Sequence, residues 1–212
     1  MKKILVSLIA LILVLGLVGG GSFASFSDTE TSLGNTFTAG TLDLEGTVTQ
    51  VVTAGSGDVT FDNEGGNFAW IVTDVAPGSA GKDVWTLTNI GSLPGDLSFT
   101  VSSIINNDND LTEPESDVDT TGGNGEGELG ANVNVVLWID LNASGSMDSG
   151  ESLYTGDLNG MAGDYPDVKA FAADDSVDIM LGWGIVSNVG NVIQSDSASF
   201  EIEFVLDQQS GI

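Results

Sequence analysis

The residues best suited to binding an ion lie between positions 140 and 151. Oxygen-bearing residues occupy positions 1, 3, 5, 9 and 12 of this twelve-residue stretch, with a glycine at position 6. This spacing is that of a calcium loop, in which position 7 adds a backbone carbonyl and the last glutamate gives two oxygens. We therefore predict a structural Ca²⁺ site formed by Asp140, Asn142, Ser144, Ser146, Asp148 and Glu151. Serine is a weaker ligand than aspartate at position 5, and an acidic turn without an ion is the alternative.

A second acidic stretch spans residues 106–130 and is rich in Asn, Asp, Glu and Gly. It has hardly an apolar residue and can therefore bury nothing, so we expect a loop that is partly mobile unless cations order it. Its carboxylates could add a cation site, but their spacing fits no template, and a solvated loop is the favoured interpretation. These carboxylates belong to Asp108, Asp110, Glu113, Glu115, Asp117 and Asp119.

Catalytic chemistry has few candidates in this sequence. It contains no histidine and no cysteine, which excludes a Ser-His triad, a His-based zinc site and a thiol nucleophile. Paired carboxylates can hydrolyse glycosides, but among 31 acidic residues no particular pair stands out. The favoured interpretation is a protein that is not an enzyme.

The N-terminus predicts export. Two lysines precede an apolar run over residues 4–18, and small residues follow it. This order is typical of a signal peptide over residues 1–24, cleaved between Ala24 and Ser25. The run is shorter than the roughly 20 apolar residues of a spanning helix, so we expect a secreted protein without membrane insertion after processing. A type IV pilin-like protein that keeps the apolar segment is an alternative, although only three residues precede the run.

The strongly negative net charge argues against nucleic acid and anionic lipid as binding partners. The processed chain would keep two lysines against 31 acidic residues, a net charge of −29. Nucleic acid and anionic lipid surfaces would be repelled by such a chain. A compact body with this charge also repels itself, so we expect it to depend on high salt or on bound divalent cations.

Period-two alternation of apolar and polar residues recurs along the processed chain and predicts an all-β protein. About eight short strands separated by turn residues indicate an antiparallel two-sheet sandwich of jelly-roll type over residues 37–212, with long acidic loops. One short helical turn is expected around residues 167–173. The expected strands are Gly40–Glu45, Thr47–Thr53, Asn67–Val75, Lys82–Asn89, Asp96–Val101, Asn132–Ile139, Val177–Val186 and Ser199–Leu206.

Several stretches carry a family resemblance. Phe26 and Asp28 follow the predicted cleavage site, and a Thr-Phe pair at 36–37 leads into Gly-Thr-Leu-Asp-Leu at residues 40–44. Residues 85–92 read WTLTNIGS, and residues 191–208 have the pattern of a closing strand. Together these stretches resemble the TasA/camelysin (CalY) family of secreted β-sandwich proteins, which form matrix fibres and surface pili. The N-terminal match is the most specific.

The resemblance implies polymerisation by donor-strand complementation. A segment over residues 25–36 would leave its own domain and pair with an open sheet edge of the next subunit. Such a head-to-tail contact generates a fibre. The residues singled out for this role are Ser25, Phe26, Asp28 and Leu33, of which Phe26 and Leu33 are isolated apolar residues. The implied partners are further copies of the chain and an anchor or initiator protein.

An alternative to the fibre subunit is a monomeric calcium-binding surface or adhesion module, in which residues 25–36 form an ordinary first strand. The camelysin branch of the family carries a metalloprotease label. The label is not transferred to this chain, because a sequence without histidine and cysteine cannot build the usual zinc centre.

Overall fold

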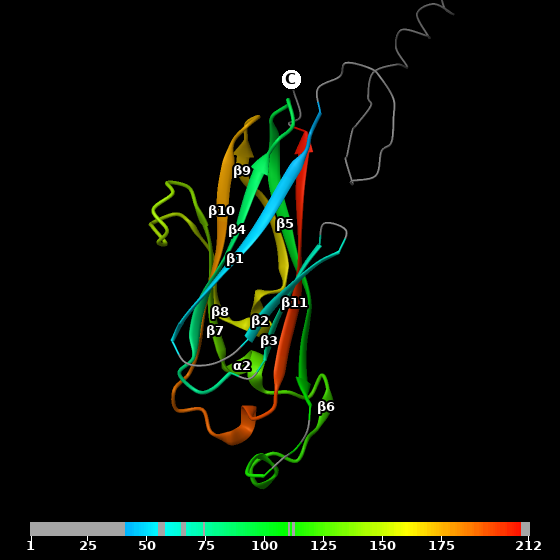
Figure 1. Cartoon of the computed structure of the whole chain (residues 1–212), viewed down its shortest axis with the longest axis vertical. Helices are drawn as coiled ribbons and strands as arrows, with labels where there is room; N and C mark the ends of the chain where they lie inside the picture. The colour runs from blue at the N-terminus through cyan, green and yellow to red at the C-terminus, as the bar shows by residue number, and fades with distance from the viewer. Residues whose placement is uncertain are drawn as a thin grey trace, which may run out of the picture.

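A computed structural model describes residues 41–54, 58–64, 67–73, 75–109, 111 and 113–208 (Figure 1). The predicted signal peptide, the cleavage site between Ala24 and Ser25, and the predicted donor segment 25–36 lie outside the described residues. Within the described residues, no helix is long and apolar enough to cross a membrane.

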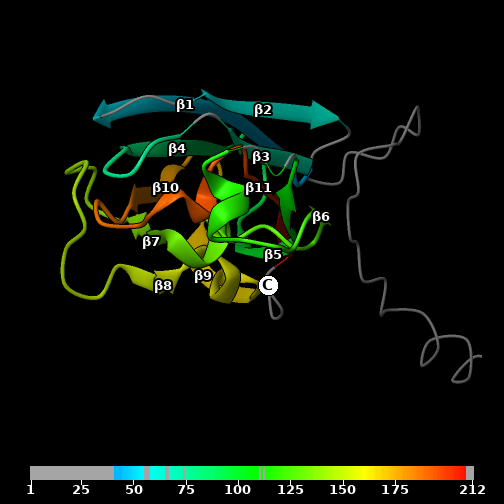
Figure 2. The ribbon, with the colours of Figure 1, turned by 90° about the horizontal axis from the view of Figure 1, so that it is seen from below.

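Two antiparallel sheets form a sandwich, which confirms the predicted fold class. Figure 2 shows the sheets in end view, with β1 and β2 along one side of the molecule and β8 and β9 along the other. The five-stranded sheet has the order β1 (Leu44–Ala54), β4 (Ala80–Asn89), β10 (Ser176–Ile185), β7 (Val133–Asp140) and β8 (Ser152–Asp157).

The six-stranded sheet has the order β2 (Asp58–Glu64), β3 (Asn67–Thr73), β11 (Ser197–Gln208), β5 (Gly95–Asp108) and β6 (Gly123–Asn124), and β9 (Gly163–Phe171) also pairs with β5. Short helical turns connect the strands. They are η1 (Glu115–Asp117), α2 (Leu129–Asn132), η2 (Leu158–Met161) and η3 (Asn191–Ile193).

The core forms where the inward faces of the two sheets meet, as the alternation predicts. In β11, Phe200 and Ile202 are buried while Glu201 and Glu203 are exposed. Phe200 stacks on Trp70 of β3 with ring centroids 5.0 Å apart. Aromatic rings of this size bury large apolar areas and dominate the packing of a small core. The buried core members of β7 are Val133, Val135, Leu137 and Ile139, at alternate positions of the predicted strand Asn132–Ile139.

Two expectations about the strands are corrected by the structure. The segments 40–45 and 47–53 are not separate strands, because residues 44–54 run as one strand paired with β4. The helical turn expected around residues 167–173 is wrong, because β9 continues to Phe171 and pairs with β5. Tyr165 of β9 stacks on Phe99 of β5 with centroids 4.6 Å apart. Pairing with a distant strand therefore overrides the local preference of this segment.

The expectation that the acidic stretch 106–130 buries nothing is also wrong. Asp108, Glu115 and Asp119 are buried, and Leu129 of α2 has no exposed surface. The stretch carries η1, β6 and α2, and it folds against one end of the sandwich, opposite the C-terminal end of β11 (Figure 1).

Candidate functional site

The predicted calcium loop joins β7 to β8 and extends from the side of the sandwich (yellow-green in Figure 1). Its first and last predicted ligands are buried, and both accept hydrogen bonds from the loop backbone. Asp140 accepts from the amides of Ser144 at 3.0 Å and Gly145 at 2.7 Å. Glu151 accepts from the amides of Leu141 at 3.0 Å and Asp148 at 2.8 Å. These bonds fold the loop back on itself between the two strands.

The middle of the loop holds the other predicted ligands near one another. Asn142 Nδ2 donates to Asp148 Oδ2 at 2.8 Å, and Ser144 Oγ donates to the carbonyl of Ser146 at 2.9 Å. Gly145 has a φ of +73°, a backbone conformation that favours glycine, as position 6 of a calcium loop requires. The structure thus brings the six predicted residues into one compact turn. Ion binding there remains a prediction.

A positive group also reaches this loop. The Nζ of Lys82, on β4, donates to the carbonyl of Gly145 at 3.0 Å. The contact ties the tip of the loop to the sandwich and places a lysine beside an acidic turn, where opposite charges attract.

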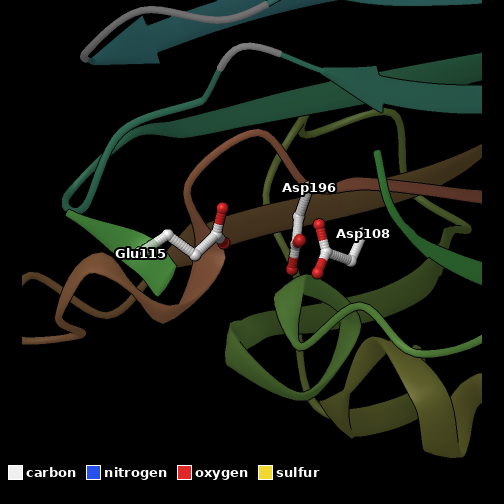
Figure 3. A group of neighbouring side chains, drawn as sticks. All are labelled: Asp108, Glu115 and Asp196. Atoms are coloured by element: carbon white, nitrogen blue, oxygen red, sulfur yellow. The ribbon is translucent and has the colours of Figure 1, made fainter. Parts of the chain in front are cut away.

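A second acidic cluster lies within the described part of the chain, where sequence reasoning favoured a solvated loop. Asp108 ends β5, Glu115 begins η1, and Asp196 lies between η3 and β11. One carboxylate oxygen from each lies within 4.8 Å of the others. Figure 3 shows the carboxyl groups of Asp108 and Asp196 facing each other, with Glu115 beside them. Their side chains are 3%, 0% and 3% exposed, respectively.

Hydrogen bonds position two of these three carboxylates. Asp196 Oδ2 accepts from the amides of Glu128 and Leu129 at 2.8 and 2.9 Å, which holds it at the start of α2. Glu115 Oε2 accepts from Ser195 Oγ at 3.2 Å. In the described structure, Asp196 Oδ1 and both carboxylate oxygens of Asp108 are buried without a hydrogen-bond partner.

Burial and crowding of acidic groups raise the pKa values of two carboxyl groups in and beside the cluster. Burial raises the pKa of Asp196 to about 6, and the charges of Glu115 and Asp108 act in the same direction against the backbone hydrogen bonds. Burial and the neighbouring charges of Asp119 and Asp196 raise the pKa of Glu128 to about 7. Adjacent carboxylates therefore disfavour one another's ionised forms.

Sequence reasoning missed Asp196 altogether and placed Asp108 and Glu115 in solvent. Asp196 is 88 residues from Asp108 along the chain, so only the pairing of β11 with β5 brings them together. The one local signal is that Leu129 stands as an apolar residue near the end of the acidic stretch, where it anchors that stretch in the core.

Comparison with known proteins gives one family match. The profile of the family described as camelysin metallo-endopeptidase matches residues 1–211. No curated protein matches the chain.

Proposed function

The chain belongs to the TasA/camelysin family, and on that premise we propose that it is a secreted structural subunit of an extracellular filament. Residues 1–24 would act as the signal peptide, removed between Ala24 and Ser25. Residues 25–36 of one processed subunit would then complete a sheet of the next, with Phe26 and Leu33 as apolar anchors. The observation that carries this proposal is the family match over nearly the whole chain.

The sandwich offers sheet edges that could receive such a strand. Among the described strands, β1 pairs with β4 alone and β2 with β3 alone. Natural edge strands are commonly protected by charges, proline or bulges. β2 has three acidic residues among seven, and β9 contains Pro166, whereas the eleven residues of β1 include one acidic residue and no proline or lysine. The one register irregularity of β1 lies near its end, between Val52 and Ala54, and β8, at the other edge of the same sheet, has six residues against eleven in β1. We therefore infer that β1 is the receiving edge, because it offers the longest edge with few protecting side chains.

Filament formation by strand exchange is tested by deleting or scrambling the donor segment, residues 25–36. One variant of the processed chain lacks residues 25–36, and a matched control keeps their length and composition in scrambled order. We expect both variants to lose filaments in negative-stain electron micrographs while retaining the melting temperature of the sandwich, because strand addition requires Phe26 and Leu33 at their own positions. Filaments of unchanged abundance from the scrambled chain would refute strand exchange, whereas a wild-type processed chain that forms no filaments would favour the monomeric surface module.

The loop 140–151 is proposed to bind a structural Ca²⁺ within the same subunit. A chelator should then lower the melting temperature of the wild-type protein more than that of Glu151→Gln, because the variant has already lost the bidentate ligand. Glu203→Gln, at an exposed position of β11, is the matched control and should respond as the wild type does. Equal responses of all three proteins in thermal melts would contradict the assignment of this loop.

We also propose that this member of the family does not act as a peptidase. A catalytic zinc ion needs nitrogen, sulfur or carboxylate ligands and an open position for water and substrate. The sequence supplies no histidine or cysteine. The three carboxylates that lie together at the end of the sandwich, those of Asp108, Glu115 and Asp196, are buried, so a peptide could not reach them. They fit a hard structural cation, not a hydrolytic centre.

A further inference from the structure

We propose that Asp108, Glu115 and Asp196 bind a calcium ion at the end of the sandwich that carries α2, with Asp119 and Glu128 at its border. This site is separate from the loop 140–151. The inference does not rest on filament formation, because all of these residues lie within the described sandwich domain of one subunit.

Two carboxylates of the cluster are buried and have oxygens without hydrogen-bond partners in the described structure. Asp108 is 3% exposed, and neither of its carboxylate oxygens has a hydrogen-bond partner in the described structure. Asp196 is also 3% exposed, and its Oδ1 faces the same cluster without a partner. Ionised carboxylates removed from water are paired, hydrogen-bonded or bound to a metal. Three carboxylate oxygens of Asp108 and Asp196 are neither paired with a positive charge nor hydrogen-bonded in the described structure.

The lysines of the described structure do not neutralise the negative charge of the cluster. The sequence has four Lys and Arg residues in total, and two of them precede residue 41. Lys82 donates to the carbonyl of Gly145, and Lys169 forms an ion pair of 2.9 Å with Asp175. Both lysines of the described structure are thus engaged elsewhere. A cation that neutralises the ionised cluster would therefore have to come from solution.

The donor set selects the kind of ion. Carboxylate oxygens are hard ligands that suit Ca²⁺ and Mg²⁺, whereas Zn²⁺ sites rely mostly on nitrogen and sulfur. Mg²⁺ holds several waters and is usually bound through one or two carboxylates, but Ca²⁺ accepts six to eight oxygens in flexible geometry. Three buried carboxylates, of which Asp108 has both oxygens and Asp196 its Oδ1 without a hydrogen bond in the described structure, match Ca²⁺ better.

The position of the ion predicts its effect on the fold. Its ligands come from the end of β5, from η1 and from the segment before β11, and Asp196 also accepts from the amides at the start of α2. An ion bound here would fasten the acidic stretch between Asp108 and α2 to the sandwich. Without the ion, repulsion between the carboxylates would loosen that stretch.

The decisive variant is Asp108→Asn in the processed chain, because it removes a ligand and a charge without breaking any hydrogen bond of the described structure. Asp117→Asn is the matched control, since Asp117 is an exposed residue of η1 in the same acidic stretch. Metal is first removed with a chelator, and Ca²⁺ is then added back. Bound Ca²⁺ per chain is counted by native mass spectrometry, and stability is followed by thermal melts.

We expect wild type and Asp117→Asn to bind one more Ca²⁺ per chain than Asp108→Asn. Free Ca²⁺ at about 100 times its Kd should raise their melting temperatures by roughly 5–10 °C more than that of the variant. In chelator the order reverses, and Asp108→Asn should melt at or above the wild type because one repelling charge is gone. Cleavage by a glutamate-specific protease after residues 115, 126 and 128 should also be faster in chelator than in Ca²⁺.

Equal Ca²⁺ counts for wild type and Asp108→Asn would overturn the proposal, and so would equal melting shifts. Displacement of Ca²⁺ by Zn²⁺ at equal concentration would overturn the choice of a hard cation. Should Asp108→Asn fail to fold, the double variant Asp140→Asn, Glu151→Gln provides the test, because it leaves the buried cluster intact. It must still bind one Ca²⁺ per chain, and binding of none would reject the site.

Discussion

At the scale of single residues, Asp83 is a buried acidic group that links the two sheets. It lies on β4 with no exposed surface, and Trp70 Nε1 of the opposite sheet donates to its Oδ2 at 2.9 Å. Burial raises the pKa of Asp83 from 3.8 to about 6, partly opposed by the hydrogen bond from Trp70. One buried carboxyl group thus joins the two sheets through an indole.

This raised pKa predicts a pH dependence of known sign. Between pH 4 and 6 the folded state holds the Asp83 proton that the unfolded state has released, so stability falls as the pH rises through about 6. The difference from the ordinary value corresponds to about 3 kcal/mol. Asp83→Asn still offers an oxygen to Trp70 but does not titrate.

Denaturant titrations at pH 4, 5, 6 and 7.5 measure this effect as a difference between two proteins, so that the titration of other carboxylates cancels. The free energy of unfolding of Asp83→Asn minus that of wild type should rise with pH by up to about 3 kcal/mol. A difference that stays constant over this range would show that Asp83 does not titrate as described.

At the scale of elements, close packing of β4 against β10 depends on a glycine. Gly81 pairs with Trp183, and a Cβ added at Gly81 would lie 2.5 Å from Cζ2 of that ring. Trp183 is buried and packs edge-on against Trp70 at 6.5 Å, so the ring has little room to move. Gly81→Ala should therefore destabilise the protein by about 1–3 kcal/mol.

The matched control is Gly184→Ala on β10. The atom nearest to a Cβ added at Gly184 is the Cβ of Ala80, at 3.6 Å, which is an ordinary contact. Thermal melts should show a drop of several degrees for Gly81→Ala and little change for Gly184→Ala. Equal melting temperatures of the two variants would mean that the indole of Trp183 is not held where the structure places it.

The sequence predicted the elements whose alternation is uninterrupted. The alternation in β11 and β7 identified their inward faces because one face is apolar throughout, as Val133 to Ile139 show. β9 was missed because Pro166 and two aspartates hide its strand character, which depends on pairing with β5. Strand pairing of this kind leaves little local signal.

The buried acidic cluster was unpredictable for a related reason. In β5 the inward positions are Leu97, Phe99 and Val101, which are odd-numbered. The register between β5 and β11 then shifts by one extra residue in β5, near Ser103, which has a φ of +53°. The extra residue changes which face later side chains take, so Asp108 points inward. A bulge of this kind cannot be located from alternation alone, whereas the calcium-loop spacing is local and could be recognised directly.

At the scale of the whole molecule, net charge and the exposed sheet edges together affect how copies of the chain associate. The sequence carries a formal net charge of −27, so subunits repel one another at low ionic strength. Divalent ions bound at two sites would lower that charge, and salt would screen the rest. In the proposed filament, the acidic residues of β2 and Pro166 of β9 would limit random association at those edges, and β1 would receive the donor strand.

The proposed assembly depends on where the leading segment of the processed chain pairs, and a cryo-electron microscopy map of assembled filaments measures this directly. We predict that residues 25–36 of each subunit form a strand along the next subunit, hydrogen-bonded to the outer edge of β1. A map in which this segment pairs within its own subunit would contradict the account, as would processed chains that stay monomeric at high concentration.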